Sequence, residues 1–334
     1  MARLLERLRL DPFVVAILAT VAVACLLPAR GAAASVASTG TTVAVGLLFF
    51  LYGARLSPGE AVAGLRHWRL HVTVLASTFV LFPLLGLAGR VLVPTVLTPA
   101  LYAGVLFLCA LPSTVQSSIA FTSIAKGNVA AAICSASMSS LLGVFITPVL
   151  VALLVTSGGG GLSAKSFVDI VLELLVPFLL GQLSRRWTAD WVTRHKKPLA
   201  LVDRGSILLV VYTAFSEGVV AGIWHQLPLP RLAALIGVDI VLLALALVIT
   251  WTAATRLRFN RADRITIVFC GSKKSLAAGL PMATVLFHGA GTIGLIVLPL
   301  MLFHQIQLMV CAALARKWAV TANSPTRVVA EVSH

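Results

Sequence analysis

Residues 264–288 read RITIVFCGSKKSLAAGLPMATVLFH, an apolar run with a polar interruption. This run is long and apolar enough to cross a bilayer, whose hydrocarbon core of about 30 Å requires roughly 20 helical residues. Gly271, Ser272, Lys273 and Lys274 interrupt its middle. A charge at that depth costs at least ~2.5–3.5 kcal/mol. The interruption therefore predicts a helix that is broken in mid-membrane at a functional site.

The composition around this stretch is that of a polytopic membrane protein. Of the 334 residues, 59% are hydrophobic and 11% are charged, whereas soluble domains carry about 25% charged residues. The net charge of +15 does not indicate a nucleic-acid partner, because the cations fall in short links between apolar runs. The five cysteines lie in apolar runs without a CxxC pair, so we expect neither a disulfide framework nor a zinc site. We also expect no other metal site and no cofactor. The lipid bilayer is the expected partner.

The apolar runs predict an all-α chain of ten transmembrane helices, at about 12–29, 37–56, 70–89, 100–125, 128–156, 165–184, 201–222, 232–254, 264–288 and 291–315. With the N-terminus inside, twenty of the 26 Lys and Arg residues fall in inside segments and four in outside segments, and the other two are Lys273 and Lys274. This asymmetry predicts that both termini are cytoplasmic. The Ala- and Arg-rich composition favours a bacterial inner membrane.

A glycine run at Gly158–Gly161 divides the ten spans into two sets of five. Because five is odd, the second set is inverted relative to the first, as in many transporters. We expect a first five-helix repeat at 1–157, an inverted repeat at 158–318 and a cytoplasmic tail at 319–334. Corresponding spans should then be broken alike. The fourth span of each half satisfies this, at Leu111–Ser118 and at Cys270–Ser275.

The polar residues of these two breaks are the candidate substrate-binding residues: Ser113, Thr114, Gln116 and Ser117 in span four, and Ser272, Lys273, Lys274 and Ser275 in span nine. Their structural alternatives are a proline kink at Pro112 with hydroxyls packed between helices, and lysines that snorkel to the membrane surface. Snorkelling fits poorly, because apolar residues flank the lysine pair on both sides.

Four further ionisable groups are candidate proton or charge partners of the lysines: Glu173, Glu217, Asp239 and His304. An acid at a helix end in contact with water, or a packed histidine that only donates a hydrogen bond, is the alternative for these positions.

The span-nine motif Gly271–Ala283 resembles the signature of the SBF-like branch of the bile acid:sodium symporter superfamily. Supporting stretches are Trp68–His71 with Phe82–Leu84, Gly127–Asn128 with Ala130–Ala132, and Phe145–Pro148. The resemblance extends from about residue 10 to 318. It implies a panel domain of spans 1, 2, 6 and 7 and a core domain of spans 3, 4, 5, 8, 9 and 10. Discontinuous spans 4 and 9 would cross in the core.

The chain departs from the true symporters of that superfamily at the sodium sites that the resemblance implies. Phe269 stands where they place a glutamate, and Lys273 where they place a glutamine ligand; the asparagine ligand falls at Ile119, next to a retained Ser118. Two hydroxyl ligands fall at Ala132 and Ala136, beside Ser135 and Ser137. The candidate ion-coupling residues are Thr78, Ser118, Ser135, Ser137 and Lys273. The Lys273 ammonium could occupy the space of a sodium ion, and sodium or a proton would be the coupling ion.

We therefore expect a secondary active, symporter-like transporter for a small organic anion that works by alternating access, and not an enzyme. No GxxxxGK[ST] motif for ATP binding is present. Two alternatives stay open. One is a membrane regulator of ion or lipid homeostasis without transport of its own. The other is a cofactor protein in which a membrane lysine forms a Schiff base with an aldehyde.

Overall fold

The helices described below come from a computed structural model, which describes residues 12–55, 67–155, 164–220, 222, 227–287 and 292–323. The side chains of residues 12, 14, 164–174 and 321–323 are not part of that description. The glycine run at 158–161 and most of the proposed tail lie outside the described residues.

The described residues form helices joined by short links, and they include no strand. The helices are α2 (Pro12–Leu26), α3 (Ala32–Arg55), α5 (Trp68–Ala76), α6 (Phe82–Ala88), α7 (Pro99–Ala110), α8 (Gln116–Ile124), α9 (Val129–Val155), α10 (Ala164–Arg194), α11 (Lys196–Val220), α12 (Leu229–Arg256), α13 (Arg261–Gly271), α14 (Leu276–Leu286) and α15 (Ile293–Asn323). A π-helical turn, Ser77–Leu81, joins α5 to α6, and a 3-10 turn, Gly89–Leu92, follows α6.

Six of these segments are individually long and apolar enough to cross a membrane: Ala32–Arg55, Trp68–Leu92, Val129–Val155, Lys196–Val220, Leu229–Arg256 and Ile293–Val320. Val15–Leu26 and Pro99–Ala110 are shorter apolar helices. The chain is thus a multi-pass membrane protein. The count of ten spans stays a prediction. The predicted spans four and nine are each divided into two helices, and each of those helices is too short to cross a membrane alone.

Two helices extend well beyond their predicted C-terminal ends. The sixth span was expected to end near residue 184, but α10 continues to Arg194 and α11 begins at Lys196. The intervening residues include Arg, Ala and Trp, and none is a helix-breaking Gly or Pro. The last helix likewise continues to Asn323, so the first residues of the expected tail are helical.

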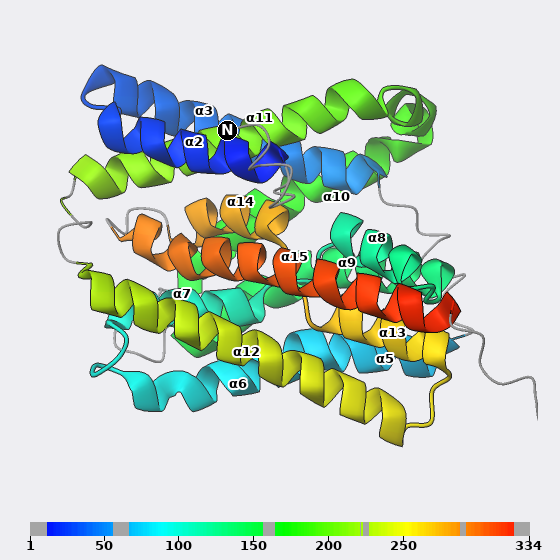
Figure 1. Cartoon of the computed structure of the whole chain (residues 1–334). Helices are drawn as coiled ribbons and strands as arrows, with labels where there is room; N and C mark the ends of the chain where they lie inside the picture. Colours follow the sequence, from blue (N-terminus) through cyan, green and yellow to red (C-terminus); the bar gives the residue numbers. More distant parts are fainter. Residues whose placement is uncertain are drawn as a thin grey trace, which may run out of the picture.

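The helices form two groups (Figure 1). In one group, α3 packs along α10 and α11, and α2 packs on α11. Glycines allow the closest of these contacts: a Cβ atom at Gly53 would lie 2.0 Å from the Phe178 carbonyl oxygen, and one at Gly181 would lie 2.0 Å from that of Phe50. Small residues at such positions let membrane helices approach until their backbones touch.

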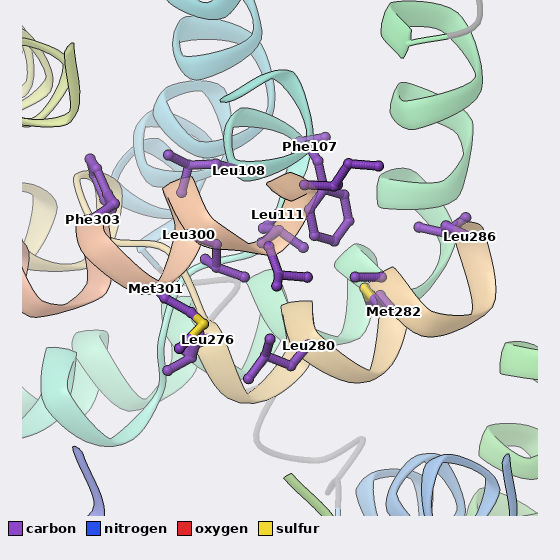
Figure 2. Packing of buried hydrophobic residues seen from close by; sticks show 14 of the residues in the cluster. Phe107, Leu108, Leu111, Leu276, Leu280, Met282, Leu286, Leu300, Met301 and Phe303 are labelled. Carbon is purple, nitrogen blue, oxygen red and sulfur yellow. The ribbon is translucent and has the colours of Figure 1, made fainter. Parts of the chain in front are cut away.

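The other group contains the interrupted helices, with α15 packed against α7, α8, α12 and α14. Its apolar core surrounds the two interruptions. Figure 2 shows Leu111, Leu280 and Leu300 among the buried side chains that gather where the end of α7, α14 and α15 meet. A Cβ atom at Gly279 would lie 2.5 Å from both Leu111 Cδ1 and Leu300 Cδ2. The non-helical segments are therefore embedded in packed protein, where lipid does not reach their free backbone groups.

Candidate functional site

The first interruption separates α7 from α8 at residues 111–115. Leu111 takes an extended conformation, with φ −73° and ψ 154°, as expected of a residue that precedes a proline. Neighbouring hydroxyl groups form hydrogen bonds with backbone groups that have no helical partner at the break. Thr147 Oγ1 donates to the Ala110 carbonyl at 2.9 Å, and the Ser113 amide donates to Ser139 Oγ at 3.0 Å. Both partners belong to α9, which therefore holds this break in shape.

The second interruption separates α13 from α14 at residues 272–275. Ser275 caps α14 by accepting a hydrogen bond from the Ala278 amide at 3.2 Å. Gln307 of α15 binds both backbone groups of Lys274: its Oε1 accepts from the Lys274 amide and its Nε2 donates to the Lys274 carbonyl, each at 2.9 Å. The Gln307 amide nitrogen also lies 2.8 Å from His304 Nδ1. His304 thus contacts the Gln307 side chain that binds the backbone of this break.

The two interruptions contact each other directly. The Ser275 amide donates to the Pro112 carbonyl at 2.9 Å. Ser118, at the start of α8, donates through Oγ to the Phe269 carbonyl near the end of α13 at 3.1 Å. The predicted breaks in spans four and nine are therefore both present, and they lie against each other in the core.

Lys274 is fully buried and its ammonium group joins three backbone carbonyls. Lys274 Nζ donates to Thr78 O at 2.9 Å, to Cys109 O at 2.8 Å and to Leu111 O at 2.7 Å. It also lies 4.2 Å from the centre of the Phe82 ring. We call the three carbonyl oxygens of Thr78, Cys109 and Leu111 the carbonyl cage. Backbone carbonyl oxygens are suitable ligands for a monovalent cation, and the Lys274 ammonium group occupies the space between them.

Local backbone breaks explain why these carbonyls are free. In the π-helical turn the Phe82 amide donates to Ser77 O, and the next residue, Pro83, has no amide hydrogen for Thr78 O. Cys109 and Leu111 lie at the end of α7, where carbonyls lose their helical partners and carry the negative end of the helix dipole. The cage therefore attracts positive charge before any side chain is considered.

Lys273 is also fully buried, but its surroundings are different. Its Nζ lies 3.9 Å from the centre of the Phe121 ring and 5.5 Å from that of Phe269. The described residues offer Nζ no hydrogen-bond acceptor. Cation–π contacts compensate only part of the desolvation cost of an ammonium group. The Lys273 ammonium group could therefore still donate hydrogen bonds to a bound anion.

The remaining polar candidates differ in their burial and in whether they have a hydrogen-bond partner. Thr114 and Ser117 hydroxyls lie 2.5 Å apart, Ser272 Oγ donates to Val268 O at 2.6 Å, Thr78 Oγ1 donates to Val74 O at 2.9 Å, and Ser135 Oγ lies 2.7 Å from His71 Nδ1. Ser113 Oγ is buried without a partner among the described residues. Gln116 is exposed and Ser137 is half-buried.

The acidic candidates are not brought together. Asp239 of α12 is fully buried, and both of its carboxylate oxygens have no hydrogen-bond partner among the described residues. Glu217 is exposed on α11. The side chain of Glu173 lies outside the description. Among the residues that were described, no group of three or more His, Cys, Asp or Glu side chains is arranged to hold a metal ion.

Several site residues were missed by reasoning from the sequence. The carbonyl cage consists of backbone atoms, and only Pro83 hints at the free carbonyl of Thr78. A second missed set lies at the α8–α9 turn, where Asn128 Nδ2 donates to Asp263 Oδ1 at 2.9 Å and Thr266 Oγ1 donates to Asn128 O at 3.0 Å. These bonds tie the start of α9 to α13, and the Gly127–Asn128 pair is their signal in the sequence.

Comparisons with known proteins show which family this chain is similar to. Residues 11–320 match the model of the SBF-like CPA transporter family. YfeH of Escherichia coli, whose name marks it as a candidate symporter, is 56% identical over 309 residues, which cover 92% of this chain and 93% of YfeH. Sodium/bile acid cotransporter 7 of Rattus norvegicus is 30% identical over 337 residues, with 98% of each chain covered. The same cotransporter of Danio rerio is 30% identical over 319 residues, covering 93% and 94%.

A match over nearly the whole chain settles the class of protein. The protein is a bile acid:sodium symporter-like transporter and not an enzyme, and it lies in a lipid bilayer. The chain belongs to the SBF-like CPA transporter family.

Proposed function

We propose that this protein is a secondary active transporter that moves a small organic anion by alternating access. Ten spans would form two inverted five-helix repeats, with both termini in the cytoplasm of a bacterial cell. The group of α2, α3, α10 and α11 would be the panel, and the group that contains both breaks would be the core. Substrate would cross between them as the panel moves against the core.

The observation that carries the proposal is the contact between two broken helices around two buried lysines. The Ser275 amide donates to the Pro112 carbonyl, so α8 and α14 both start near this contact between the breaks. Helix N-termini carry partial positive charge. Lys273, without a hydrogen-bond acceptor among the described residues, adds a full positive charge. This electrostatic field favours an anion, and the hydroxyls of Ser113, Thr114, Ser117 and Ser275 would supply hydrogen bonds to it.

We further propose that a proton, rather than sodium, is the coupling ion. The Lys274 ammonium already satisfies the carbonyl cage, where a sodium ion would otherwise find three oxygen ligands. We infer that Lys274, rather than the Lys273 expected from the resemblance, holds the place of a cation. Asp239 is the buried acid that could carry a proton, because no described group pairs with its carboxylate oxygens. Ionisable groups inside a membrane protein commonly mark ion pathways.

Uptake into proteoliposomes tests this function. The purified chain is reconstituted, and accumulation of a panel of radiolabelled carboxylates, sulfonates and bile acids is measured with a sodium gradient, with a proton gradient or with neither. Proton-driven accumulation of one anion is the expected result. If every anion fails under every gradient while the protein is folded and reconstituted, the regulator without transport becomes the better explanation.

A further inference from the structure

A cationic cavity lies at the end of the core where α5 begins, α12 ends and α13 begins. It has a volume of about 320 Å³, and its lining includes His67, Trp68, Arg69, Arg258, Phe259 and Asn260. Among the described residues, no hydrogen bond joins this lining to either break. We therefore treat the cavity as a feature separate from the proposed substrate site.

Two guanidinium groups give the cavity its charge. Arg69 is held in place, since Nη2 donates to the Leu257 carbonyl at 3.2 Å and Cζ lies 5.5 Å from the centre of the Phe259 ring. Arg258 follows α12 in a left-handed conformation, with φ 58°, and its side chain is exposed. Arg carries five N–H donors in a planar fork, so one bond to a carbonyl leaves several donors for a ligand.

The acid in the lining does not cancel this charge. Asp263 is 6% exposed, and its two carboxylate oxygens accept hydrogen bonds from the side-chain amides of Asn128 at 2.9 Å and of Asn260 at 2.8 Å. The carboxylate is thus directed toward the α8–α9 turn and the start of α13. Two exposed guanidinium groups remain against one buried, hydrogen-bonded carboxylate.

The ends of two apolar segments indicate that the cavity lies at the level of lipid headgroups. The apolar segments Trp68–Leu92 and Leu229–Arg256, each long enough to cross the membrane, have one of their ends at its rim. Trp68 is 62% exposed there. Tryptophan at the end of an apolar span is typical of the membrane–water interface, and basic pockets between helix ends at that level bind anionic headgroups.

We propose that this cavity binds the phosphate group of an anionic phospholipid. Arg69 and Arg258 contact the phosphate oxygens, the lipid chains extend along the outer faces of α5 and α12, and Trp68 lies beside the glycerol region. The chemistry recognised is a phosphate ester, which a free phosphate ion shares. The exposed tryptophan and the adjoining apolar helices favour the lipid as its source.

Native mass spectrometry of the full chain in detergent tests this site. The probes are phosphatidylglycerol, zwitterionic phosphatidylethanolamine and inorganic phosphate. We expect phosphatidylglycerol to bind most tightly, and the Arg258→Ala and Arg69→Ala variants each to bind it about tenfold more weakly, the loss expected for one charge-assisted hydrogen bond. Arg69→Lys should keep part of the affinity because it keeps the charge.

Arg256→Ala is the matched control, because Arg256 is exposed at the same end of α12 but does not line the cavity. Equal losses in Arg256→Ala and Arg258→Ala would overturn the site in favour of diffuse attraction. Equal binding of the two lipids would also overturn it. Displacement of phosphatidylglycerol by millimolar inorganic phosphate, with no preference for lipid, would replace the lipid by a free phosphate ion. Melting curves of each variant separate lost binding from lost folding, and no transport measurement enters.

Discussion

Lys273 and Lys274 are adjacent in the chain, but their ammonium groups occupy opposite environments. Lys274 donates to three backbone carbonyls, whereas Lys273 faces the rings of Phe121 and Phe269 without an acceptor among the described residues. The first arrangement stabilises the broken backbone. The second leaves a buried charge that a ligand could neutralise. We therefore expect the two lysines to respond differently to substitution.

Replacing Lys274 should destabilise the protein. In Lys274→Met three buried carbonyls lose their donor, at about 1–3 kcal/mol for each unsatisfied group. The melting temperature in detergent, followed by tryptophan fluorescence, should fall clearly below that of the native chain. Lys197→Met, at an exposed lysine, is the control and should melt like the native protein. An unchanged melting temperature for Lys274→Met would show that the cage contributes nothing.

A small cation should partly rescue a variant that empties the cage. In Lys274→Ala the three carbonyls remain, and methylammonium or sodium could bind them in place of the lost side chain. Ligand binding to the folded state alone raises its stability. The melting temperature of Lys274→Ala should therefore rise with added methylammonium or sodium chloride, whereas that of the native chain should respond only as it does to choline chloride. Identical responses of the two proteins would argue against a cation site.

Replacing Lys273 should leave folding intact and remove transport. Lys273→Met keeps most of the length of the side chain and removes a buried charge that lacks a hydrogen-bond acceptor among the described residues, a change that is often neutral or stabilising. We expect a melting temperature at or above that of the native chain. Uptake of the transported anion should be lost, because the substrate loses its positive partner. Intact uptake in a well-folded Lys273→Met protein would remove this residue from the site.

The positions of both breaks could be predicted from the sequence, but the roles of the lysines could not. Pro112 and the Gly271–Lys274 stretch oppose a continuous apolar helix, and the structure has both breaks. Which lysine binds the cage depends on the free carbonyls of Thr78, Cys109 and Leu111. These carbonyls belong to the backbone, so the types of the three residues do not indicate that the carbonyls lack helical partners. That lack depends on Pro83 and on the residue at which α7 ends, and the end of α7 is known only from the structure.

The candidate acids illustrate a second limit of the sequence. Asp239 and Glu217 both lie in apolar runs, but the first is fully buried and the second is exposed. A helix presents only part of its circumference to the core, and the apolar pattern of a membrane helix does not mark that part, because lipid-facing positions are apolar too. Burial therefore had to come from the structure.

Asp239 should determine the response to a proton gradient. Asp239→Asn keeps the size of the side chain and removes the titratable group. We expect accumulation driven by a proton gradient to disappear, while exchange of the anion across the membrane without a gradient persists. Asp190→Asn, at an exposed position of α10, should retain both activities. If Asp239→Asn accumulates substrate as the native chain does, proton coupling must lie elsewhere.

Tyr52 should stabilise the contact between the two helix groups. Its hydroxyl donates to the carbonyl of Ala277 in the first turn of α14, at 3.3 Å. That carbonyl lacks its helical partner because the residue four positions later is Pro281, which has no amide hydrogen. Tyr52→Phe removes the donor and leaves the ring, so the proposed panel should separate from α14 more easily. We expect faster amide hydrogen exchange in α14, by up to about tenfold for a bond of about 1 kcal/mol.

Tyr212→Phe is the matched control, since the Tyr212 hydroxyl donates to Leu27 O at 2.9 Å within the first helix group. It should leave exchange in α14 unchanged, and equal effects of the two variants would show that the Tyr52 contact does not hold the groups together.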